Sequence, residues 1–405
     1  MMQMVHSRFN ALLSACVLSL IATAGWSQSL TWLGTLGGRD SRAYGVSADG
    51  SVVVGDARNA RGSYRAFRWQ NGVMQDLGTL GGGWSAAWGV SADGAVVVGG
   101  AKNAAGEPRA FRWQNGVMQD LGTLGGIESY AYDVSADGSV VAGWAKNAAG
   151  QWRAFRWENG VMQDLGTMGG DYNAPYGVSA DGAVVVGCAK NAAGQYHAFR
   201  WQNGVMQDLG TLGGDRSGAY GVSANGAVVV GWADNAAVPY RAFRWENGVM
   251  QDLGALGGNH SEAYGVSADG SVVVGWAHNA ANQQRAFRWT ASGGMEDLNT
   301  TYASLLTNGS VLAVAYAISP DGRYIVGQGY NAVTRRNEAF LLDTRCTTHN
   351  GDVDANGCVD DADLLAVLYA FGNRGSNLGR VDVNCDGAVD DADLLTVLFN
   401  FGSGC

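Results

Sequence analysis

A 44-residue unit repeats along most of this chain, and no other feature of the sequence limits its fold so strongly. The phrase Asp-Leu-Gly-Thr-Leu-Gly-Gly, with small variations, begins at Asp76, Asp120, Asp164, Asp208 and Asp252. Two more strings keep fixed places in the unit: Ser-Ala-Asp-Gly, as at residues 47–50, and Arg-Ala-Phe-Arg-Trp, as at residues 65–69. A fixed period of this length predicts one supersecondary unit that is repeated in space.

Each unit divides into four short expected strands, which in the first unit are residues 43–47, 51–56, 65–69 and 73–77. Ala48-Asp49-Gly50 forms the turn after the first strand, and Asn71-Gly72 is a strong hairpin signal between the third and the fourth. β-branched and aromatic residues bounded by Gly and Asn, without a sustained 3.6-residue periodicity, favour strands over helices. We therefore expect an all-β fold built from four-stranded units.

The chain contains seven units, because seven first turns and seven Ala-Phe strings occur, the last at Ala339-Phe340. The seventh unit lacks its own fourth strand, whereas residues 30–34 align with residues 74–78 and precede the first unit. We expect this N-terminal strand to complete the last blade and close a seven-bladed β-propeller over residues 25–345, since closure removes exposed strand edges. An open β-solenoid is the alternative, and it would need distinct capping units.

The repeat strings resemble the bacterial extracellular repeat family that is named after its His-Ala-Phe (HAF) tripeptide. That tripeptide occurs at His197-Ala198-Phe199, and the other copies read Arg-Ala-Phe or, at Glu338, Glu-Ala-Phe. The resemblance covers about residues 30–343 and implies an extracellular repeat protein of unassigned role.

The first 24 residues have the form of a secretory signal peptide, in which Arg8 precedes an apolar run over residues 11–24. This run is short for a membrane span. Leu13-Ser14-Ala15-Cys16 also fits a lipoprotein cleavage box, which is the alternative. We expect a protein that is secreted to the extracellular space or the cell surface and has no membrane span.

The last sixty residues, 346–405, predict a second, small all-α domain that begins with paired calcium loops. In each loop, oxygen-bearing side chains occupy positions 1, 3, 5, 9 and 12, Gly occupies position 6, and position 7 offers a backbone carbonyl. The predicted ligands are Asp352, Asp354, Asn356, Cys358, Asp360 and Asp363 in the first loop, and Asp382, Asn384, Asp386, Ala388, Asp390 and Asp393 in the second. Position 12 is Asp rather than the usual Glu. An acidic, solvated loop is the alternative, but two full matches in tandem favour two Ca²⁺ ions.

Each loop runs into an expected amphipathic helix with an apolar face, formed by Leu364, Leu365, Leu368 and Phe371 in the first and by Leu394, Leu395, Leu398 and Phe401 in the second. Loop plus following helix, twice, resembles a type I dockerin over about residues 351–402. The resemblance implies calcium-dependent binding to a cohesin-like module. In that family positions 10 and 11 of each loop direct partner choice, and here they are Asp361, Ala362, Asp391 and Ala392. A compact calcium-bound unit that merely ends the chain is the alternative.

Charge is concentrated in this tail, which has ten Asp and two Arg, a net charge of −8, while the whole chain has −10. Without calcium these carboxylates repel one another, so we expect the tail to need metal for its fold. The sequence has no basic stripe of the kind that binds nucleic acid.

Four cysteines also lie in the tail, and in a secreted protein we expect Cys346, Cys358, Cys385 and Cys405 to form two disulfides. Four cysteines allow three pairings, and the sequence does not choose among them. A four-cysteine zinc site is the alternative, although the spacings fit no zinc pattern. Cys188, in the repeats, is expected to be a free and partly buried thiol.

Comparison of the units within the chain separates uniform segments from variable ones. The turns barely change, whereas the residues after each Gly-Gly pair and the loops between the second and third strands differ. In a four-stranded meander both variable segments lie on the same side of the ring, and loops on a rigid scaffold often bind ligands. We expect exposed aromatic residues there to contact a glycan or a cell-surface protein: Trp84, Tyr130, Trp152, Tyr172, Tyr196 and Tyr240. Drift between recently duplicated units is the alternative.

The repeats offer no catalytic centre that the sequence can identify. The five His residues are singly placed, and the unrepeated acids of the variable segments form no pair at a usable spacing: Asp40, Glu128, Asp171, Asp215 and Glu262. We therefore interpret the chain as a secreted, non-catalytic binding or interaction propeller tethered through its calcium-dependent tail. An extracellular carbohydrate-active enzyme, a glycan hydrolase or lyase, is the alternative, and only analogy with other dockerin-bearing proteins favours it.

Overall fold

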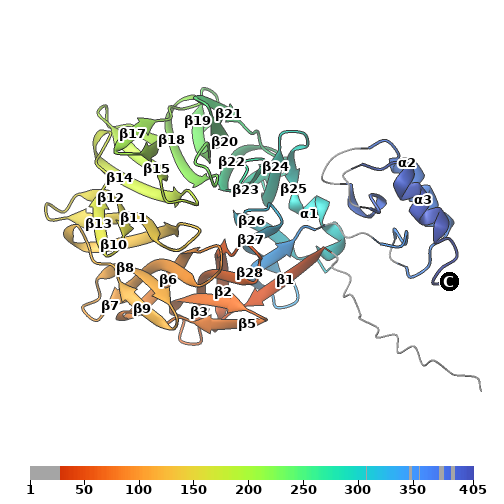
Figure 1. Cartoon of the computed structure of the whole chain (residues 1–405), viewed down its shortest axis with the longest axis horizontal. Coiled ribbons are helices and arrows are strands. Elements are labelled where there is room, and N and C mark those ends of the chain that lie inside the picture. Colours follow the sequence, from red (N-terminus) through yellow and green to blue (C-terminus); the bar gives the residue numbers. More distant parts are fainter. Residues whose placement is uncertain (1–27, 307, 346–348, 355, 374–377, 385–387) are drawn as a thin grey trace, which may run out of the picture.

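The computed structural model describes residues 28–306, 308–345, 349–354, 356–373, 378–384 and 388–405. Its strands form antiparallel sheets arranged around a common axis, and two longer helices lie in the C-terminal tail (Figure 1). The expected signal peptide, with Cys16, lies outside the described residues. Among the residues that are described, no helix is long and apolar enough to cross a bilayer.

Five repeats each form one four-stranded sheet. These sheets consist of β6 (Gly81–Val90), β7 (Val96–Asn103), β8 (Pro108–Gln114) and β9 (Val117–Asp120); β10 (Gly125–Val134), β11 (Val140–Asn147), β12 (Trp152–Glu158) and β13 (Val161–Asp164); β14 (Gly169–Val178), β15 (Val184–Asn191), β16 (Tyr196–Gln202) and β17 (Val205–Asp208); β18 (Gly213–Val222), β19 (Val228–Asn235), β20 (Arg241–Glu246) and β21 (Val249–Asp252); and β22 (Gly257–Val266), β23 (Val272–Asn279), β24 (Gln284–Thr290) and β25 (Gly294–Asp297).

The remaining strands share one eight-stranded sheet. It contains β1 (Ser29–Gly34), β2 (Gly37–Val46), β3 (Val52–Asn59), β4 (Tyr64–Gln70), β5 (Val73–Asp76), β26 (Val311–Ile318), β27 (Tyr324–Asn331) and β28 (Arg336–Asp343). The helices are α1 (Leu298–Thr301), η1 (Ala303–Leu306), α2 (Asp361–Ala370), η2 (Gly379–Val381) and α3 (Asp391–Phe399).

The N-terminal strand pairs with the end of the repeat region, as the sequence predicts. β1 runs antiparallel to β28, with Leu30 opposite Leu342 and Trp32 opposite Phe340. Because β26, β27 and β28 have no fourth strand of their own in sequence order, β1 supplies it. Between the two halves of the eight-stranded sheet, the strands pair in parallel at Asp40 and Asn337.

The first strand of each unit begins earlier than we expected. In the first unit β2 starts at Gly37, so the residues after the Gly-Gly pair belong to a strand and not to a loop. Gly37 has a φ of +92°. A Cβ at Gly38 would lie 2.5 Å from the Cβ of Arg58, which a real side chain could not do. The Gly-Gly pair therefore permits a close approach of β2 to β3 that a turn-based interpretation overlooks.

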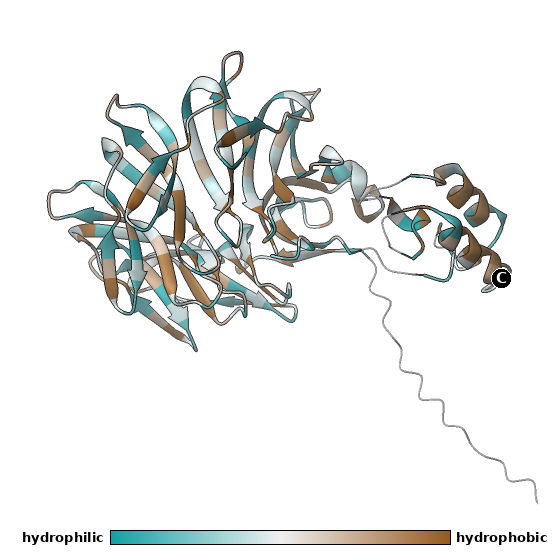
Figure 2. Ribbon diagram, turned by 45° about the horizontal axis from the view of Figure 1, so that its top comes forward, coloured by the Kyte–Doolittle hydropathy of each residue, from teal (hydrophilic) through white to brown (hydrophobic). Residues whose placement is uncertain are grey.

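The hydrophobic core of the repeats lies between neighbouring sheets. One cluster joins Val52 and Val54 of β3 to Val97 and Phe111 of the next sheet, and all four are fully buried. The Phe of every Ala-Phe string is likewise buried: Phe67, Phe111, Phe155, Phe199, Phe243, Phe287 and Phe340. Each such side chain stabilises the fold by roughly 2 kcal/mol on burial. Hydrophobic positions are accordingly concentrated along the strands (Figure 2).

Backbone hydrogen bonds also connect each unit to the next. The Ala of every Ser-Ala-Asp-Gly turn donates its N–H to the equivalent carbonyl of the following unit, over 2.8–3.1 Å, from Ala48 through to Pro320. Proline has no N–H, so Pro320 can only accept. A second hydrogen bond between units runs from the Ala of the Ala-Phe string to a Ser of the next unit, as from Ala66 N–H to the Ser85 hydroxyl at 2.9 Å. The same bond joins the last unit to the first, where Ala339 N–H donates to the Ser41 hydroxyl at 2.8 Å.

In the tail, a helix follows each loop, as predicted, but the packing differs from the expected apolar faces. Six valines form the core: Val353, Val359, Val367, Val383, Val389 and Val397. Leu364 and Leu394 pack against this core, whereas Leu365, Leu368 and Phe371 are each about half exposed, at 45–50%. These valines pack between the two loop–helix units of the tail. Part of each predicted apolar helix face is therefore turned outward.

Candidate functional site

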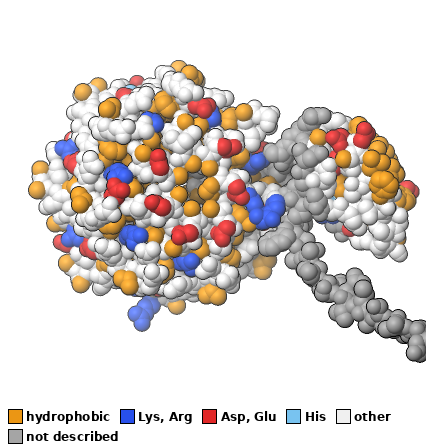
Figure 3. Space-filling view, viewed as in Figure 1, with side chains coloured by type: hydrophobic (Ala, Val, Ile, Leu, Met, Phe, Trp, Pro, Cys, Tyr) orange, Lys and Arg blue, Asp and Glu red, His pale blue; other side chains and the backbone are white. Residues whose placement is uncertain are grey.

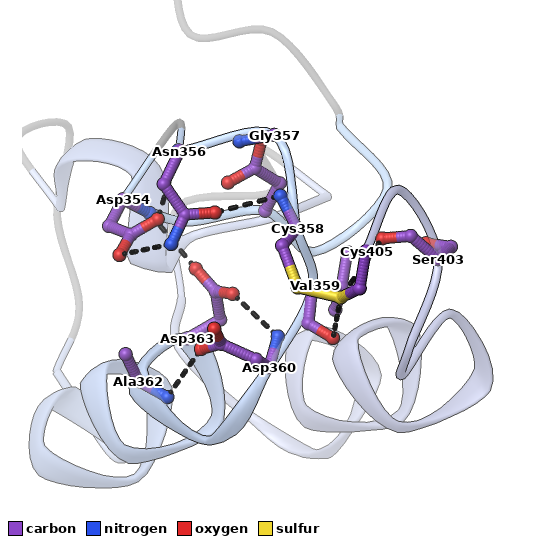
Figure 4. Close-up of a disulfide and its surroundings, with 11 residues drawn as sticks. Asp354, Asn356, Gly357, Cys358, Val359, Asp360, Ala362, Asp363, Ser403 and Cys405 are labelled. Atoms are coloured by element: carbon purple, nitrogen blue, oxygen red, sulfur yellow. Dashed lines mark hydrogen bonds between the residues drawn. A yellow bond between two sulfur atoms is a disulfide. The ribbon is translucent and has the colours of Figure 1, made fainter.

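Three carboxylates of the first tail loop come together. One oxygen each from Asp352, Asp354 and Asp363 lies within 4.8 Å of the other two. Figure 4 shows Asp363 reaching from the start of α2 toward the loop that carries Asp354 and Asn356. Clustered carboxylates are the oxygen ligands that hard cations prefer, so this triad can hold a metal ion.

The start of α2 determines the position of Asp363. Asp360 caps this helix and forms a capping box with Asp363. The Asp363 oxygens accept backbone N–H groups from Val353 (2.6 Å), Asp354 (3.0 Å) and Asp360 (2.9 Å). Burial alone would raise the pKa of Asp363, but these donors outweigh it and lower the pKa. The carboxylate is therefore ionised at neutral pH.

Asp352 adds a second indication of a cation site. Its Oδ2 accepts the N–H of Gly357 at 3.1 Å. Its Oδ1 is buried, and within the described part of the chain it has no hydrogen-bond partner. A buried oxygen without a partner is costly, and a cation bound between the three carboxylates would satisfy it.

The other predicted calcium ligands are not part of this carboxylate triad. In the first loop the Asn356 amide bonds to Asp354 and to the Cys358 N–H. In the second loop Asp390 and Asp393 repeat the capping box, and Asp393 accepts the Asn384 N–H at 3.0 Å. Asp382 is buried, Ala388 is partly buried, and Asp386 lies outside the described residues. The positions expected to direct partner choice, Asp361, Ala362, Asp391 and Ala392, are all exposed.

One predicted disulfide is present beside the first loop. Cys358 and Cys405 are bonded, with their Cα atoms 4.7 Å apart, which resolves one of the open pairings (Figure 4). Cys346 and Cys385 lie outside the described residues. Cys188 is a buried free thiol, and burial raises its pKa to about 12, so it is unreactive at neutral pH.

In the repeats, many variable positions turn out to be complementary pairs within one sheet. Asp40 lies 3.3 Å from Arg58, and Glu128 lies 3.0 Å from Lys146 at the equivalent positions two units later. In the fifth unit the charges are exchanged, and Arg216 meets Asp234 at 2.8 Å. Part of the variation is therefore compensated locally, which unconstrained drift between copies would not produce.

The six predicted ligand-contacting aromatics belong to this side of the ring, but they are not exposed loop residues. Five lie in strands, Tyr240 directly precedes β20, and all six are half-buried. They contact other rings: Tyr130 lies 4.6 Å from Trp144, Trp152 lies 3.7 Å from Trp144, and Tyr240 lies 4.8 Å from Trp232, measured between ring centroids. For Trp84, Tyr130 and Tyr172 the difference arises because the strand that begins at Gly-Gly includes residues expected in loops. Trp152 and Tyr196 instead begin the third strands of their units.

The sequence interpretation missed a second aromatic set, here called the central ring: Tyr44, Trp88, Tyr132, Tyr176, Tyr220, Tyr264 and Tyr316. Each is the extra residue of a β-bulge on the first strand of its unit, as Tyr44 is between Ala43 and Gly45. A bulge redirects its side chain out of the regular alternation. Successive rings then contact one another at 4.9–5.4 Å from Trp88 through Tyr316 to Tyr44. The recurrent Ala-Tyr-Gly-Val string was the available signal.

The central ring encloses a cavity of about 390 Å³ on the axis. A second cavity of about 360 Å³, lined mainly by Val and Ala, adjoins it toward the Ser-Ala-Asp-Gly turns. Asp133 lines both cavities, and it is the one carboxylate among the described residues that do so. Burial raises the pKa of Asp133 to about 6, against the opposing effect of two backbone hydrogen bonds.

The hydroxyl groups of the central ring are held by neighbours. Tyr132 accepts from Trp144 Nε1 at 3.3 Å, and Tyr264 donates to Glu262 at 2.9 Å. Arg42 donates to the Tyr44 hydroxyl at 3.2 Å. Burial raises the pKa of all six tyrosines of the ring, so their hydroxyls stay protonated at neutral pH.

No family model matches the chain, and no curated protein matches it. Solved structures do. An oligogalacturonate lyase from Vibrio parahaemolyticus matches with a TM-score of 0.53 and 10% identity, over 79% of this chain and 96% of that one. An oligogalacturonate lyase in complex with manganese matches with a TM-score of 0.50 and 13% identity, over 78% and 95%. TolB from Acinetobacter baumannii gives 0.42 and 12%, over 63% of this chain and 65% of its own. The first two likenesses concern the fold alone, and together with the sheets around one axis they identify a β-propeller.

Proposed function

We propose that this protein is a secreted, non-catalytic binding module: a propeller that presents an aromatic ligand-binding face, carried by a calcium-dependent, dockerin-like tail that binds a cohesin-like module. The observation that carries the proposal is the concentration of half-buried aromatic residues at one side of the ring. Rigid aromatic side chains held by neighbours supply contact area at low entropic cost, and such anchors dominate binding energies.

For the propeller we infer seven blades, closed by β1, of the HAF-repeat type. Support comes from the pairing of β1 with β28, which gives the last three strands a fourth. The contact of Ser41 with Ala339 also repeats the link between sequence neighbours. The seven aromatic residues of the central ring, one for each sequence unit, agree with this count.

For the tail we infer two bound Ca²⁺ ions, one in each loop. The carboxylate triad and the unpaired Asp352 oxygen support the first site, and the repeated capping box of Asp390 and Asp393 supports the second. The loop spacing, with its backbone carbonyl at position 7, favours Ca²⁺ over smaller cations that demand octahedral geometry.

The outer face of the tail supports a protein partner. Leu365 and Leu368 of α2 and Leu395 and Leu398 of α3 are each about half exposed, at 47–50%. Figure 3 shows hydrophobic side chains gathered on one side of this unit. The two halves present similar residues, so a cohesin-like module could bind either. The exposed carboxylates of Asp361 and Asp391 would favour a partner with basic residues at its contact.

The test is a glycan array on the isolated ring, residues 28–345, with turnover assays on every glycan that binds. Binding without release of new reducing ends or unsaturated products supports the proposal. Turnover would instead support a glycan hydrolase or lyase. The Trp152→Ala and Tyr240→Ala variants should lose the binding, and Tyr369→Ala in the full chain, a highly exposed tail residue, serves as the control.

A further inference from the structure

The residue that follows each aromatic of the central ring is small in every unit except the third. The residue after the aromatic is Gly in five units and Ala317 in the last, but it is Asp133 in the third: Gly45, Gly89, Gly177, Gly221 and Gly265 occupy the equivalent places. A Cβ at these glycines would lie 2.6–3.1 Å from its nearest neighbour. The local packing therefore disfavours a side chain here, and the third unit nevertheless carries a carboxylate.

The Asp133 carboxylate is built into the wall between two units. Its Oδ1 accepts the Val134 N–H at 2.8 Å, and its Oδ2 accepts the Val178 N–H of the next unit at 2.9 Å. Each oxygen keeps a lone pair, because a carboxylate can accept about four hydrogen bonds. The side chain is thus fixed in place and still able to receive a ligand from the cavities that it lines.

The other groups around the cavity favour a cation over a sugar. The cavity of about 390 Å³ is lined by the seven aromatic residues of the central ring, and the negative faces of aromatic rings attract cations. Among the described residues, Asp133 is the one charged side chain of this lining, and a carboxylate beside aromatic faces favours a cation over a neutral sugar. The other lining residues are Gly, Val, Ala and Ile.

We propose that the central cavity binds a small organic cation, an ammonium group seated within the aromatic ring and paired with the Asp133 carboxylate. Aromatic cages with an added carboxylate recognise quaternary and methylated ammonium groups. A volume of about 390 Å³ accommodates a ligand of the size of choline. Three charged side chains lie behind the rings: Arg42 contacts Tyr44, Asp56 lies 3.9 Å from Arg42, and Glu262 contacts Tyr264. The positive charge of Arg42 is thus paired and does not oppose a cation in the cavity. The site adjoins the outer aromatics of the proposed ligand-binding face, because the rings of Trp84 and Tyr130 lie 6.1 and 5.9 Å from that of Trp88. Asp133 lines only the central cavities and belongs to neither aromatic set.

The test uses choline and its uncharged carbon isostere, 3,3-dimethylbutan-1-ol, with the full chain at pH 8 and constant ionic strength. Binding is measured by calorimetry and by the fluorescence of Trp88 and its neighbours. We expect choline to bind at least ten-fold more tightly than the isostere. Asp133→Asn and Asp133→Gly should both reduce that preference several-fold, because only the attraction of the aromatic rings remains. Gly is the residue that five other units carry. Asp215→Asn removes an exposed carboxylate outside the cavity and should keep the preference.

Three results would overturn the proposal: no choline binding to the wild-type chain, equal binding of the isostere, or an unchanged preference in a folded Asp133→Gly variant. Circular dichroism establishes that the variants are folded, and Asp133→Gly remains usable if Asp133→Asn is not. A glycan array on Asp133→Gly separates the two functions, because loss of the cation site should leave glycan binding intact. A failed array with intact choline binding would count against the proposed function alone.

Discussion

Each sheet of the ring is held by its neighbours, whereas the two halves of the tail are held by a few specific groups. In the ring, clusters such as that of Val54 and Phe111 recur between successive sheets. In the tail, six valines, the bond from Cys358 to Cys405 and a set of carboxylates perform the same task. A small domain has too little apolar area to bury, so it depends on cross-links and metal. Stability in the ring is distributed, and stability in the tail is concentrated.

The largest expected effect tests whether β1 closes the ring, by measuring what its removal does to the free energy of unfolding. A chain that begins at Thr35 lacks β1, and with it the buried Leu33 and the partly buried Leu30 and Trp32. We expect the free energy of unfolding to fall by roughly 5 kcal/mol, since each large apolar side chain contributes 1.5–3 kcal/mol. Calorimetry of the isolated ring measures this. Ala at the outward-facing Ser29 and Thr31 is the control. An unchanged melting temperature for the truncated chain would show that the ring does not close through β1.

The second effect should appear in the tail alone. Calcium chelation should remove the helical signal of α2 and α3 and leave the strand signal of the ring, because only the tail is expected to depend on metal. Calorimetric titration of the full chain should count two Ca²⁺ ions, and Asp363→Ala and Asp393→Ala should each remove one. Asp361→Ala, an exposed neighbour, should remove none. If the titration finds no calcium binding, the tail is only an acidic helical unit.

The sequence predicted the strands, the pairing of β1, and the helix after each loop, because each rests on a local pattern that the copies repeat. The central ring was not predicted. A bulge adds one residue to a strand, and period-two alternation then assigns the aromatic to the wrong side. Asp133 was not predicted either, because it lies within a strand and not among the variable residues after Gly-Gly or in the loops. The reversed ion pair of Arg216 and Asp234 could not be predicted either, because the sequence alone does not show that these two positions face each other.

A third prediction concerns Asp133, a partly buried acid of the ring. Burial raises the pKa of Asp133 to about 6 in the fold, above its ordinary value, so folding favours the protonated form. The stability that this group contributes is therefore present at pH 4 and is lost as the pH rises through about 6. Relative to Asp133→Gly, the wild-type chain should lose about 2 kcal/mol between pH 4 and pH 7. Burial also raises the pKa of Asp56 to about 6, but Asp56 changes the stability of the wild-type chain and of the Asp133→Gly variant equally. Denaturant titrations at each pH check the difference, and a constant difference would contradict it.

The smallest effect should come from one turn among seven. The Ser135 hydroxyl accepts the Val140 N–H at 2.9 Å and donates to Asp137 at 2.6 Å, and every unit repeats this arrangement. Ser135→Ala removes both bonds and should cost about 1 kcal/mol, or a fall of about 2–4 °C in melting temperature. Because the turns lie on the opposite side from the aromatic residues, ligand affinity should not change. Trp152→Ala should instead lose binding from a ring that is still folded. If Ser135→Ala removes binding from a ring that is still folded, the ligand-binding face is the turn side.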